Sequence, residues 1–291
     1  SGVANVVTTG QFTIPLMKSI GYKPHFAGAV EAVASTGGQI MPPVMGAAAF
    51  VMAEFLGTSY STIMMAAVIP AVLYYLACWT MIHLEARKEG LQGLPADQLP
   101  DIKKVIREFG HLSLPVFAIV GLLLYGLTPL YAAFFTILIT IVVSHLRKAT
   151  GITLAGITRA LIAGAKGAVG VAMACAVVGF VVGVSSLTSL GLTFGNNILA
   201  MSQNNMLLTL FLTMITMLIL GMGLPTTACY IVGATIAAPP LVKLGVEPLV
   251  AHFFVFYFAC LSNLTPPVCL AAFTAAGIAG APPYKVGWTS T

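Results

Sequence analysis

The sequence predicts an all-α polytopic membrane protein built from an inverted-topology repeat, with two re-entrant helical hairpins and two broken helices. Three observations lead to this prediction: an apolar composition, a stretch of sequence that occurs twice, and basic residues that cluster in alternate loops. Of the 291 residues, 58% are hydrophobic and 7% are charged, and the mean hydropathy is +0.99. A soluble domain carries about 25% charged residues, so this composition indicates an integral membrane protein.

Long apolar runs indicate where the chain would cross the bilayer. Each run approaches the roughly 20 residues that a helix needs to span a membrane. The runs are Thr62–Ile82, Leu112–Pro129, Leu130–His145, Gly167–Leu187 and Met206–Leu220.

Residues 1–57 recur as residues 225–281, at a constant offset of 224 positions and without a gap. All four prolines of the first copy coincide with prolines of the second; the pairs are Pro15/Pro239, Pro24/Pro248, Pro42/Pro266 and Pro43/Pro267. Proline lacks a backbone donor and clashes with the preceding helical turn, so matching prolines predict matching backbone breaks. Two such broken-helix units in an apolar chain are typical of membrane transporters.

The first copy begins with a hairpin tip at residues 1–5 and continues into a broken span over about 26–57. The two halves of this span, Phe26–Ala34 and Val44–Leu56, flank a break at residues 35–43 with the sequence STGGQIMPP. Further spans are expected at about 60–84, 111–128 and 130–146, with a solvated loop and a short helix at Glu85–Gly110. An amphipathic piece along the inner membrane surface, Ile152–Gly164, would precede a span that begins near Gly167.

The second copy follows the same plan with a complete hairpin. An apolar arm at Asn205–Leu220 stops at the tip Gly221–Thr227, and a short arm returns through Ala228–Leu244. The next span is broken at residues 261–267, between His252–Cys260 and Val268–Ile278. Non-helical backbone at membrane depth persists only where it is buried in protein or lines a cavity. We therefore expect both tips to lie inside the protein, next to the breaks.

Basic residues collect on one side when the spans are threaded in alternating directions. With Lys18–His25 in the cytoplasm, 12 of the 13 basic residues are cytoplasmic and only Lys243 lies outside, as positive-inside sorting requires. Five spans then separate the two copies, and an odd number inverts the second copy relative to the first.

The breaks are rich in neutral oxygen atoms, which suit the hard cation Na⁺. Ser262, Asn263 and Thr265 are expected to face Thr226 and Thr227 at the tip. The helix that begins near Val268 would offer its amino terminus to an anionic substrate group. No lysine or arginine is predicted at mid-membrane depth, so such an anion must meet helix ends, a bound cation or a residue outside this chain.

Four motifs carry a resemblance to a known family: SGVANVVTTG…IP…GY, GGQIMPPVMGAAAF, LGMGLPTTACYI and SNLTPPV. They resemble the large membrane subunit of the tripartite ATP-independent periplasmic (TRAP) transporters, in the fused form that joins the small and large membrane subunits in one polypeptide. The resemblance covers essentially all of the chain. It implies a multi-pass protein of a bacterial or archaeal inner membrane.

The resemblance implies a secondary transporter, not an enzyme, which imports a small organic acid by an elevator mechanism. A periplasmic substrate-binding protein would deliver the acid, and an ion gradient would drive uptake without ATP. The coupling ion would be Na⁺, with H⁺ as the alternative. The other partners would be the small membrane subunit and the lipid bilayer; no cofactor, transition metal or nucleic acid is expected.

The resemblance also assigns site residues and domains. A first ion site would comprise Ser1, Asn5, Gly37, Ile40 and Pro42, and a second would comprise Gly221, Thr226, Thr227, Asn263 and Thr265. Substrate contacts are expected from Gly38, Gln39, Gly223 and Ser262. The transport domain would comprise 1–57 and 204–291, the scaffold spans 58–151 with the cytoplasmic loop 85–110, and an amphipathic arm with one span 152–203.

Glu31 and Glu54 flank the first break, whereas their counterparts in the second copy are Val255 and Ile278. A carboxylate inside the membrane is a candidate functional group by default. Glu31 is therefore a candidate proton-binding residue that would replace or supplement Na⁺. The alternative is an interfacial position, or a partner on a span outside this chain.

The sequence opens inside a motif, without an initiating methionine, and stops after a proline-rich loop at Ala281–Trp288. We therefore expect a fragment of a longer permease. Two other functions remain open: a related secondary transporter that needs no binding protein, and a passive channel. An intramembrane hydrolase is disfavoured, because the sequence has no H-E-x-x-H motif and no paired membrane aspartates.

Overall fold

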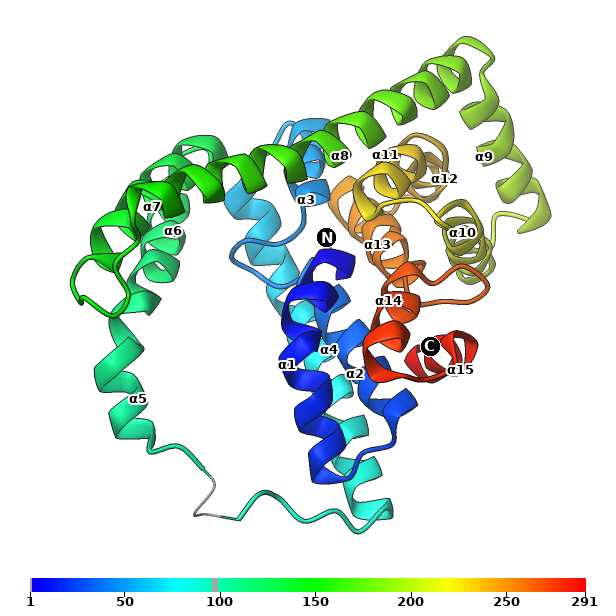
Figure 1. Ribbon diagram of the computed structural model, residues 1–291. Helices are drawn as coiled ribbons and strands as arrows, with labels where there is room; N and C mark the ends of the chain where they lie inside the picture. Colours follow the sequence, from blue (N-terminus) through cyan, green and yellow to red (C-terminus); the bar gives the residue numbers. More distant parts are fainter. Residues whose placement is uncertain (1, 96–98) are drawn as a thin grey trace.

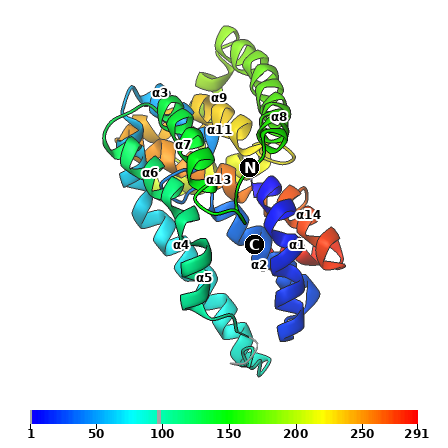
Figure 2. The ribbon, with the colours of Figure 1, turned by 60° about the vertical axis from the view of Figure 1, so that its left-hand side comes forward.

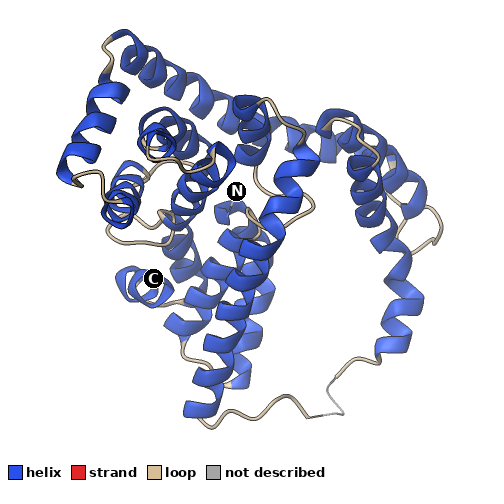
Figure 3. Cartoon of the chain, turned by 180° about the vertical axis from the view of Figure 1, so that it is seen from behind, coloured by secondary structure: helices blue, strands red, loops and turns tan. Residues whose placement is uncertain are grey.

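The computed structural model describes residues 2–95 and 99–291, and helices dominate them, with no strand in those ranges (Figure 3). This confirms the all-α fold class. The α-helices are α1 Gly2–Ile20, α2 Pro24–Gly37, α3 Ala47–Leu56, α4 Tyr60–Lys88, α5 Ile102–Phe109, α6 Leu114–Leu124, α7 Pro129–Ser144, α8 Leu154–Leu187, α9 Leu190–Met201, α10 Met206–Leu220, α11 Thr226–Ile236, α12 Ala238–Lys243, α13 Pro248–Leu261, α14 Leu270–Ala279 and α15 Pro283–Ser290. A 3₁₀ turn, η2 Gly110–Ser113, links α5 to α6.

The repeat offset of 224 residues reappears in the helix boundaries. α2 and α13 both begin at a proline, Pro24 and Pro248, because its fixed φ suits the first helical position. A glycine with positive φ precedes each of them, Gly21 at 115° and Gly245 at 91°. Both spans are then interrupted, between α2 and α3 and between α13 and α14, and each break contains a cis Pro–Pro bond. The two predicted broken helices are thus confirmed.

One of the paired prolines does not produce a matching break. Pro15 lies inside α1, which continues to Ile20, whereas α11 ends at Ile236 and α12 restarts at Ala238. A lone proline removes a single helical hydrogen bond. The second copy has two consecutive prolines, Pro239 and Pro240, and the helix is interrupted just before them, at Ala237.

The second halves of the broken spans are exchanged between the repeats: α14 packs on α1 and α2, while α3 packs on α11 and α13 (Figure 1). The end of α14 lies at the start of α2, since a Cβ on Gly28 would sit 3.2 Å from the Cβ of Ala279. Phe55 at the end of α3 stacks on Tyr230, which hydrogen-bonds His252 near the start of α13. The broken span of each repeat therefore ends beside the start of the broken span of the other repeat. The two broken spans run antiparallel, as an inverted-topology repeat requires.

Helix α4 is attached to the first repeat along its length. The hydroxyl groups of Tyr74 and Tyr75 donate to the carbonyl oxygens of Val33 and Ala34 at 2.9 and 2.8 Å, near the carboxyl end of α2. The Ala34 carbonyl also accepts the backbone N–H of Gly38 at 3.3 Å, so Tyr75 gives it a second hydrogen bond. The division into transport and scaffold domains stays a prediction, but these bonds tie α4 to α2.

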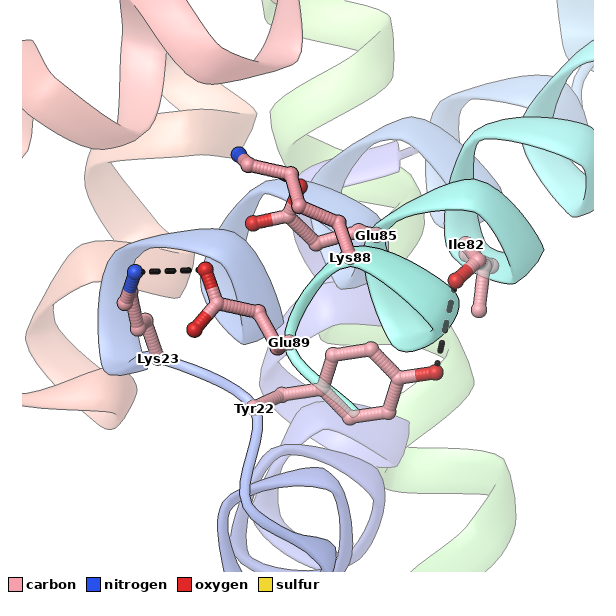
Figure 4. Close-up of polar contacts among 6 residues, drawn as sticks. All are labelled: Tyr22, Lys23, Ile82, Glu85, Lys88 and Glu89. Atoms are coloured by element: carbon pink, nitrogen blue, oxygen red, sulfur yellow. Dashed lines mark hydrogen bonds and ion pairs between the residues drawn. The ribbon is translucent and has the colours of Figure 1, made fainter. Parts of the chain in front are cut away.

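A second attachment joins the carboxyl end of α4 to the loop between α1 and α2, as Figure 4 shows. Lys23 Nζ and Glu89 Oε1 lie 2.7 Å apart, and the Tyr22 hydroxyl donates to the Ile82 carbonyl at 3.4 Å. The hydrogen bond to Glu89 raises the pKa of Lys23, and the same bond lowers the pKa of Glu89. Both groups are exposed, so solvent screens the pair and its contribution to stability is small.

Helix α8 extends past the two repeats from α7 to α9 and packs on α11 (Figure 1 and Figure 2). Leu154–Leu187 is one helix of 34 residues, so the expected surface piece ending at Gly164 and the expected span from Gly167 belong to a single helix, and their placement in the membrane stays a prediction. A glycine inside a helix costs only about 1 kcal/mol relative to alanine. The apolar residues on both sides of these glycines sustain the helix across them.

The proline-rich segment Ala281–Trp288 is not a loop. Pro283 occupies the first turn of α15, which runs to Ser290. Proline is favoured at this position because its missing N–H has no helical acceptor there. The two prolines therefore start a helix here instead of preventing one.

Within the described residues, three helical stretches are long and apolar enough to cross a membrane: Tyr60–Lys88, Ile102–Leu124 and Leu154–Ser185. Many large apolar side chains on these helices are exposed, such as Met65, Phe117 and Phe180. Exposed surface of this kind fits contact with lipid or with neighbouring spans. The buried core lies instead where the broken helices of the two repeats meet α1, α4 and α11.

Candidate functional site

The tip between α10 and α11 touches the break after α13, as expected. Gly221 lies so close to Ser262 that a Cβ on the glycine would be 2.2 Å from the serine Oγ. The Asn263 side-chain amide donates to Thr226 Oγ1 at 3.0 Å and to the Ala259 carbonyl at 3.3 Å. Ser262, Asn263 and Thr226 are all buried. These contacts join tip and break into one polar junction, which we call the second junction.

The donors at the second junction leave oxygen atoms available. Both hydrogen bonds of the Asn263 side chain use its nitrogen, so its carbonyl oxygen can serve another partner. Thr265 is half-buried and donates to the Leu261 carbonyl at 3.0 Å. Thr227 is half-buried at the start of α11. Neutral oxygens gathered in a buried place suit a small hard cation, but no contact here tests the ligand roles.

The corresponding junction of the first repeat joins α1 to the break after α2. A Cβ on Gly2 would lie 3.1 Å from Thr36 Oγ1 and 3.3 Å from Gln39 Nε2. Both of these polar atoms are buried and lack a hydrogen-bond partner among the described residues. A buried unpaired polar atom is costly, so this first junction has unmet capacity for a polar ligand. Ser1, predicted as an ion ligand here, lies outside the described residues.

The other predicted ligands of the first ion site differ in their surroundings. In the break after α2, Ile40 is 1% exposed and Pro42 is half-buried, and Gly37, the last residue of α2, is buried. Asn5 is exposed on α1, and its backbone carbonyl accepts a hydrogen bond from Thr9 at 2.9 Å. The structure therefore brings Gly37 and Ile40 to the break and leaves the Asn5 side chain outward.

The four predicted substrate residues divide equally between buried and exposed positions. Gln39 and Ser262 are buried at their junctions, whereas Gly38 and Gly223 are exposed. Gly223 has a φ of 75°, a conformation that glycine adopts readily. A Cβ there would be 3.6 Å from Val268, so the outer face of the second tip lies close to the start of α14.

Two helices begin directly after the breaks, α3 at Ala47 and α14 at Leu270. Neither amino terminus has a side-chain cap or an acidic residue in its first turn. Uncapped amino-terminal N–H groups bind anions readily. The breaks thus place two positive helix ends near the junctions, although α14 starts two residues later than predicted.

A cavity of ≈ 660 Å³ opens between α2, α4 and α13, and it is less polar than the two junctions. Its lining is mainly apolar, with residues such as Val30, Leu73 and Leu261, and it includes none of the four predicted substrate residues. An apolar lining offers an ionised acid little compensation for lost hydration. The junctions are the better candidates for polar ligands.

Sequence reasoning missed the residues that surround Glu31. Glu31 is 5% exposed, and its carboxylate lies within hydrogen-bonding reach of Thr9, Thr13 and Ser35. Thr9 and Thr13 stand one helical turn apart on α1, a spacing that puts both on one helix face. That spacing was the available signal.

Sequence reasoning also missed the role of α4 in supporting the first break. A Cβ on Gly37 would lie 2.4 Å from the Tyr74 ring. A buried tyrosine needs a partner for its hydroxyl group, so the adjacent pair Tyr74 and Tyr75 in an apolar span was the signal here.

Comparisons with known proteins agree with this architecture. The model of the tripartite ATP-independent periplasmic transporter family, DctM component, matches residues 1–291. The isethionate TRAP transporter permease protein DctMQ of Oleidesulfovibrio alaskensis is 26% identical over 300 residues, covering 97% of this chain and 44% of that protein. The sialic acid TRAP transporter large permease protein SiaM of Vibrio cholerae is 25% identical over 288 residues, covering 97% of this chain and 65% of that protein.

The chain therefore spans between 44% and 65% of the length of these two relatives. The family match extends from the first junction through both broken spans to α15. It includes every residue that forms the two junctions. The chain belongs to the DctM component family of the tripartite ATP-independent periplasmic transporters.

Proposed function

We propose that this chain is the part of an ion-driven permease that binds and moves a small organic acid across an inner membrane. Its two relatives are named for isethionate and sialic acid, a sulfonate and a carboxylic acid, and both are anions at neutral pH. The proposed cargo is therefore a small organic anion. A periplasmic binding protein would deliver it, and a small membrane subunit would complete the permease.

The antiparallel arrangement of the two broken spans is the observation that supports this function best. Inverted copies give a protein two alternative, nearly equivalent ways to expose one central site, first to one side and then to the other. The exchange of α3 and α14 between the repeats makes the two copies one body, which suits an elevator movement. In this proposal the two tips are re-entrant and enter the membrane from opposite sides.

The polar ligands would meet at the two junctions. Na⁺ would bind the oxygens around Asn263, Thr226 and Thr265, and a second Na⁺ would bind at the first junction near Thr36 and Gly37. The helices that form the junctions carry no lysine or arginine apart from Lys18, which lies in the last turn of α1, at the opposite end of that helix from Gly2. The substrate anion would therefore be held by the uncapped amino ends of α3 and α14 and by the bound cations.

Uptake into proteoliposomes tests this proposal. The full-length permease, reconstituted with its binding protein and a labelled acid that this binding protein retains, is given a Na⁺ gradient and a pH gradient separately. We expect uptake that requires the binding protein and an inward Na⁺ gradient, and that is independent of ATP. Uptake without the binding protein would instead indicate a related transporter family, and gradient-independent flux in both directions would indicate a channel.

A further inference from the structure

Four polar side chains form a compact cluster between α1 and α2, about one helical turn from the first junction. Glu31 Oε1 lies 2.5 Å from Thr9 Oγ1 and 3.1 Å from Ser35 Oγ, and Glu31 Oε2 is hydrogen-bonded to Thr13 Oγ1. Glu31 is 5% exposed and belongs to a helix packed on both α1 and α14. A carboxyl group is thus surrounded by three hydroxyl groups inside the protein.

The hydroxyl groups of this cluster can serve Glu31 in either protonation state. Thr9 Oγ1 also lies 2.9 Å from the Asn5 carbonyl, and Thr13 Oγ1 lies 3.1 Å from the Thr9 carbonyl. Each hydroxyl has one hydrogen to donate, and these three hydrogens make the three bonds to an ionised Glu31. A proton on Glu31 adds a fourth hydrogen. Glu31 then donates to one threonine, and that threonine donates to its own helix carbonyl.

The second repeat shows that packing does not require this cluster. At an offset of 224 residues, the counterparts of Thr9, Thr13, Glu31 and Ser35 are Gly233, Ala237, Val255 and Ala259. All four counterparts are buried and apolar. The same helix contact is therefore stable with small apolar side chains. The first repeat replaces all four with groups that hold or donate protons, which indicates a task beyond packing.

No cation neutralises Glu31 among the described residues. The only titratable group of α1 besides this cluster is Lys18, which donates to the Ala279 carbonyl at 2.9 Å. On α2 itself His25 lies six residues from Glu31, about 9 Å along a helix. The other titratable or charged groups on helices packed against α2 are Tyr284 and Lys285 on α15; Tyr60, Tyr74, Tyr75, Cys78, His83, Glu85, Arg87 and Lys88 on α4; and His252, Tyr257 and Cys260 on α13.

None of these groups is hydrogen-bonded or ion-paired to Glu31 in the described part of the chain, and α14 carries no titratable group. An ionised carboxylate buried without a cation costs several kcal/mol. A bound proton removes that cost. Thr9 is exposed at the edge of the cluster, so a proton can reach Glu31 through its hydroxyl group.

We propose that Glu31, held by Thr9, Thr13 and Ser35, is a proton-binding site that exists only in the first repeat. The proton comes from solvent, forms an O–H bond with a Glu31 oxygen and returns to solvent when it leaves. The site lies next to the first junction, because the Thr9 hydroxyl lies within hydrogen-bonding distance of the Asn5 carbonyl and Ser35 immediately precedes Thr36. This proton site is distinct from the proposed Na⁺ and substrate sites, and it can be tested independently of them.

Infrared spectroscopy of the purified full-length permease tests the site without substrate, binding protein or gradient. The C=O stretch of a protonated carboxyl group is distinct from the bands of a carboxylate. We expect this stretch near neutral pH in the wild type, with the shift that D₂O causes, and we expect Glu31→Gln to remove it. The matched control is Glu54→Gln, which changes an exposed glutamate of the same broken span and should leave the stretch unchanged.

A second variant guards against misfolding of Glu31→Gln. Glu31→Val with Ser35→Ala copies the buried packing of Val255 and Ala259 in the second repeat, so it should fold and should also lose the stretch. A protonated-carboxyl stretch of wild-type intensity in either folded variant would overturn the proposal, as would a wild type that shows only carboxylate bands near neutral pH. In proteoliposomes, Glu31→Gln should abolish the response of uptake to a pH gradient while exchange of substrate continues.

Discussion

Replacing Gly221 with alanine tests the contact between the second tip and its break. A Cβ at Gly221 would lie 2.2 Å from Ser262 Oγ, 2.4 Å from Ser262 Cβ and 2.9 Å from Cys229 Sγ, where ordinary contacts begin at 3.4 Å. The serine hydroxyl can rotate away, but its Cβ is held by the backbone at the end of α13. The tip must therefore withdraw by roughly 1 Å, which is the difference between 3.4 and 2.4 Å.

This displacement should have two measurable consequences. Overpacking of a buried site costs about 1–3 kcal/mol, and this loss lowers Tm, by less per kcal/mol in a long chain than in a small domain. A withdrawal of this size would also break the 3.0 Å hydrogen bond between Asn263 and Thr226. If Na⁺ binds at the second junction, its stabilisation, about 2.7 kcal/mol at 100 times Kd, should shrink in the variant.

The assay is thermal unfolding of the purified full-length permease in detergent, in NaCl and in KCl at equal ionic strength. Gly221→Ala should lower Tm in KCl and lose most of the additional stabilisation by NaCl. Ser262→Gly in the same chain removes both overlapping serine atoms and should restore part of the loss.

The matched control is Gly277→Ala on α14, where a Cβ would meet nothing within 4 Å. Its Tm should stay equal or rise, because alanine favours a helix by about 1 kcal/mol over glycine, and its response to NaCl should be that of the wild type. If Gly221→Ala shows the Tm and the NaCl response of the wild type, the close approach of tip and break does not govern ion binding, and the reasoning fails.

Three further predictions concern hydrogen bonds and charge. Asn263→Ala should leave the protein folded but reduce the rise of Tm in NaCl, because it removes an amide oxygen from the second junction; an unchanged rise would make this residue purely structural. Tyr75→Phe should destabilise the permease by about 1 kcal/mol, measured by thermal unfolding, because the Ala34 carbonyl loses its 2.8 Å hydrogen bond to the Tyr75 hydroxyl; an unchanged Tm would mean that this bond does not stabilise the contact between α4 and α2. The lowered pKa of Glu89 and the raised pKa of Lys23 make their ion pair stabilising between the ordinary pKa values of the two groups. This stabilisation is lost as pH falls through the folded pKa of Glu89 or rises through that of Lys23. Glu89→Gln should therefore lower Tm slightly at neutral pH, less than Tyr75→Phe does, and the difference from wild type should vanish in acid or in high salt; a difference that persists in acid would contradict the assignment.

Local chemistry explains which features were predictable. Proline and glycine act on the backbone of their own neighbourhood, so the pairs Pro24/Pro248 and Gly21/Gly245 revealed the starts of α2 and α13 before any tertiary contact was known. The same local reasoning failed where context decided the outcome. Pro15 is tolerated inside α1, and two prolines open α15.

The candidate site was predictable only in part, for a related reason. The same spacing of tip and break in both copies indicated that each tip would meet its own break. The close approach of Gly221 to Ser262 and of Gly2 to Thr36 confirms this prediction. The sequence could not show that Thr9 and Thr13 face Glu31, because the register between two packed helices depends on how their surfaces fit together. Nor could it show that α4 would contact the end of α2 through Tyr74 and Tyr75.

The sequence by itself determined the membrane class, the family, the duplicated broken spans and their inversion, because composition, proline positions and loop charge are properties of the chain that need no folding to be read. Only the tertiary structure decided which polar atoms share a site. It exchanged α3 and α14 between the repeats. Among the described residues, it left Thr36 Oγ1 and Gln39 Nε2 without a hydrogen-bond partner at the first junction, and it placed Glu31 next to the hydroxyl groups of Thr9 and Thr13 on α1. These outcomes arise from packing between segments distant in sequence, where shape and burial select the partners and no local pattern records the choice.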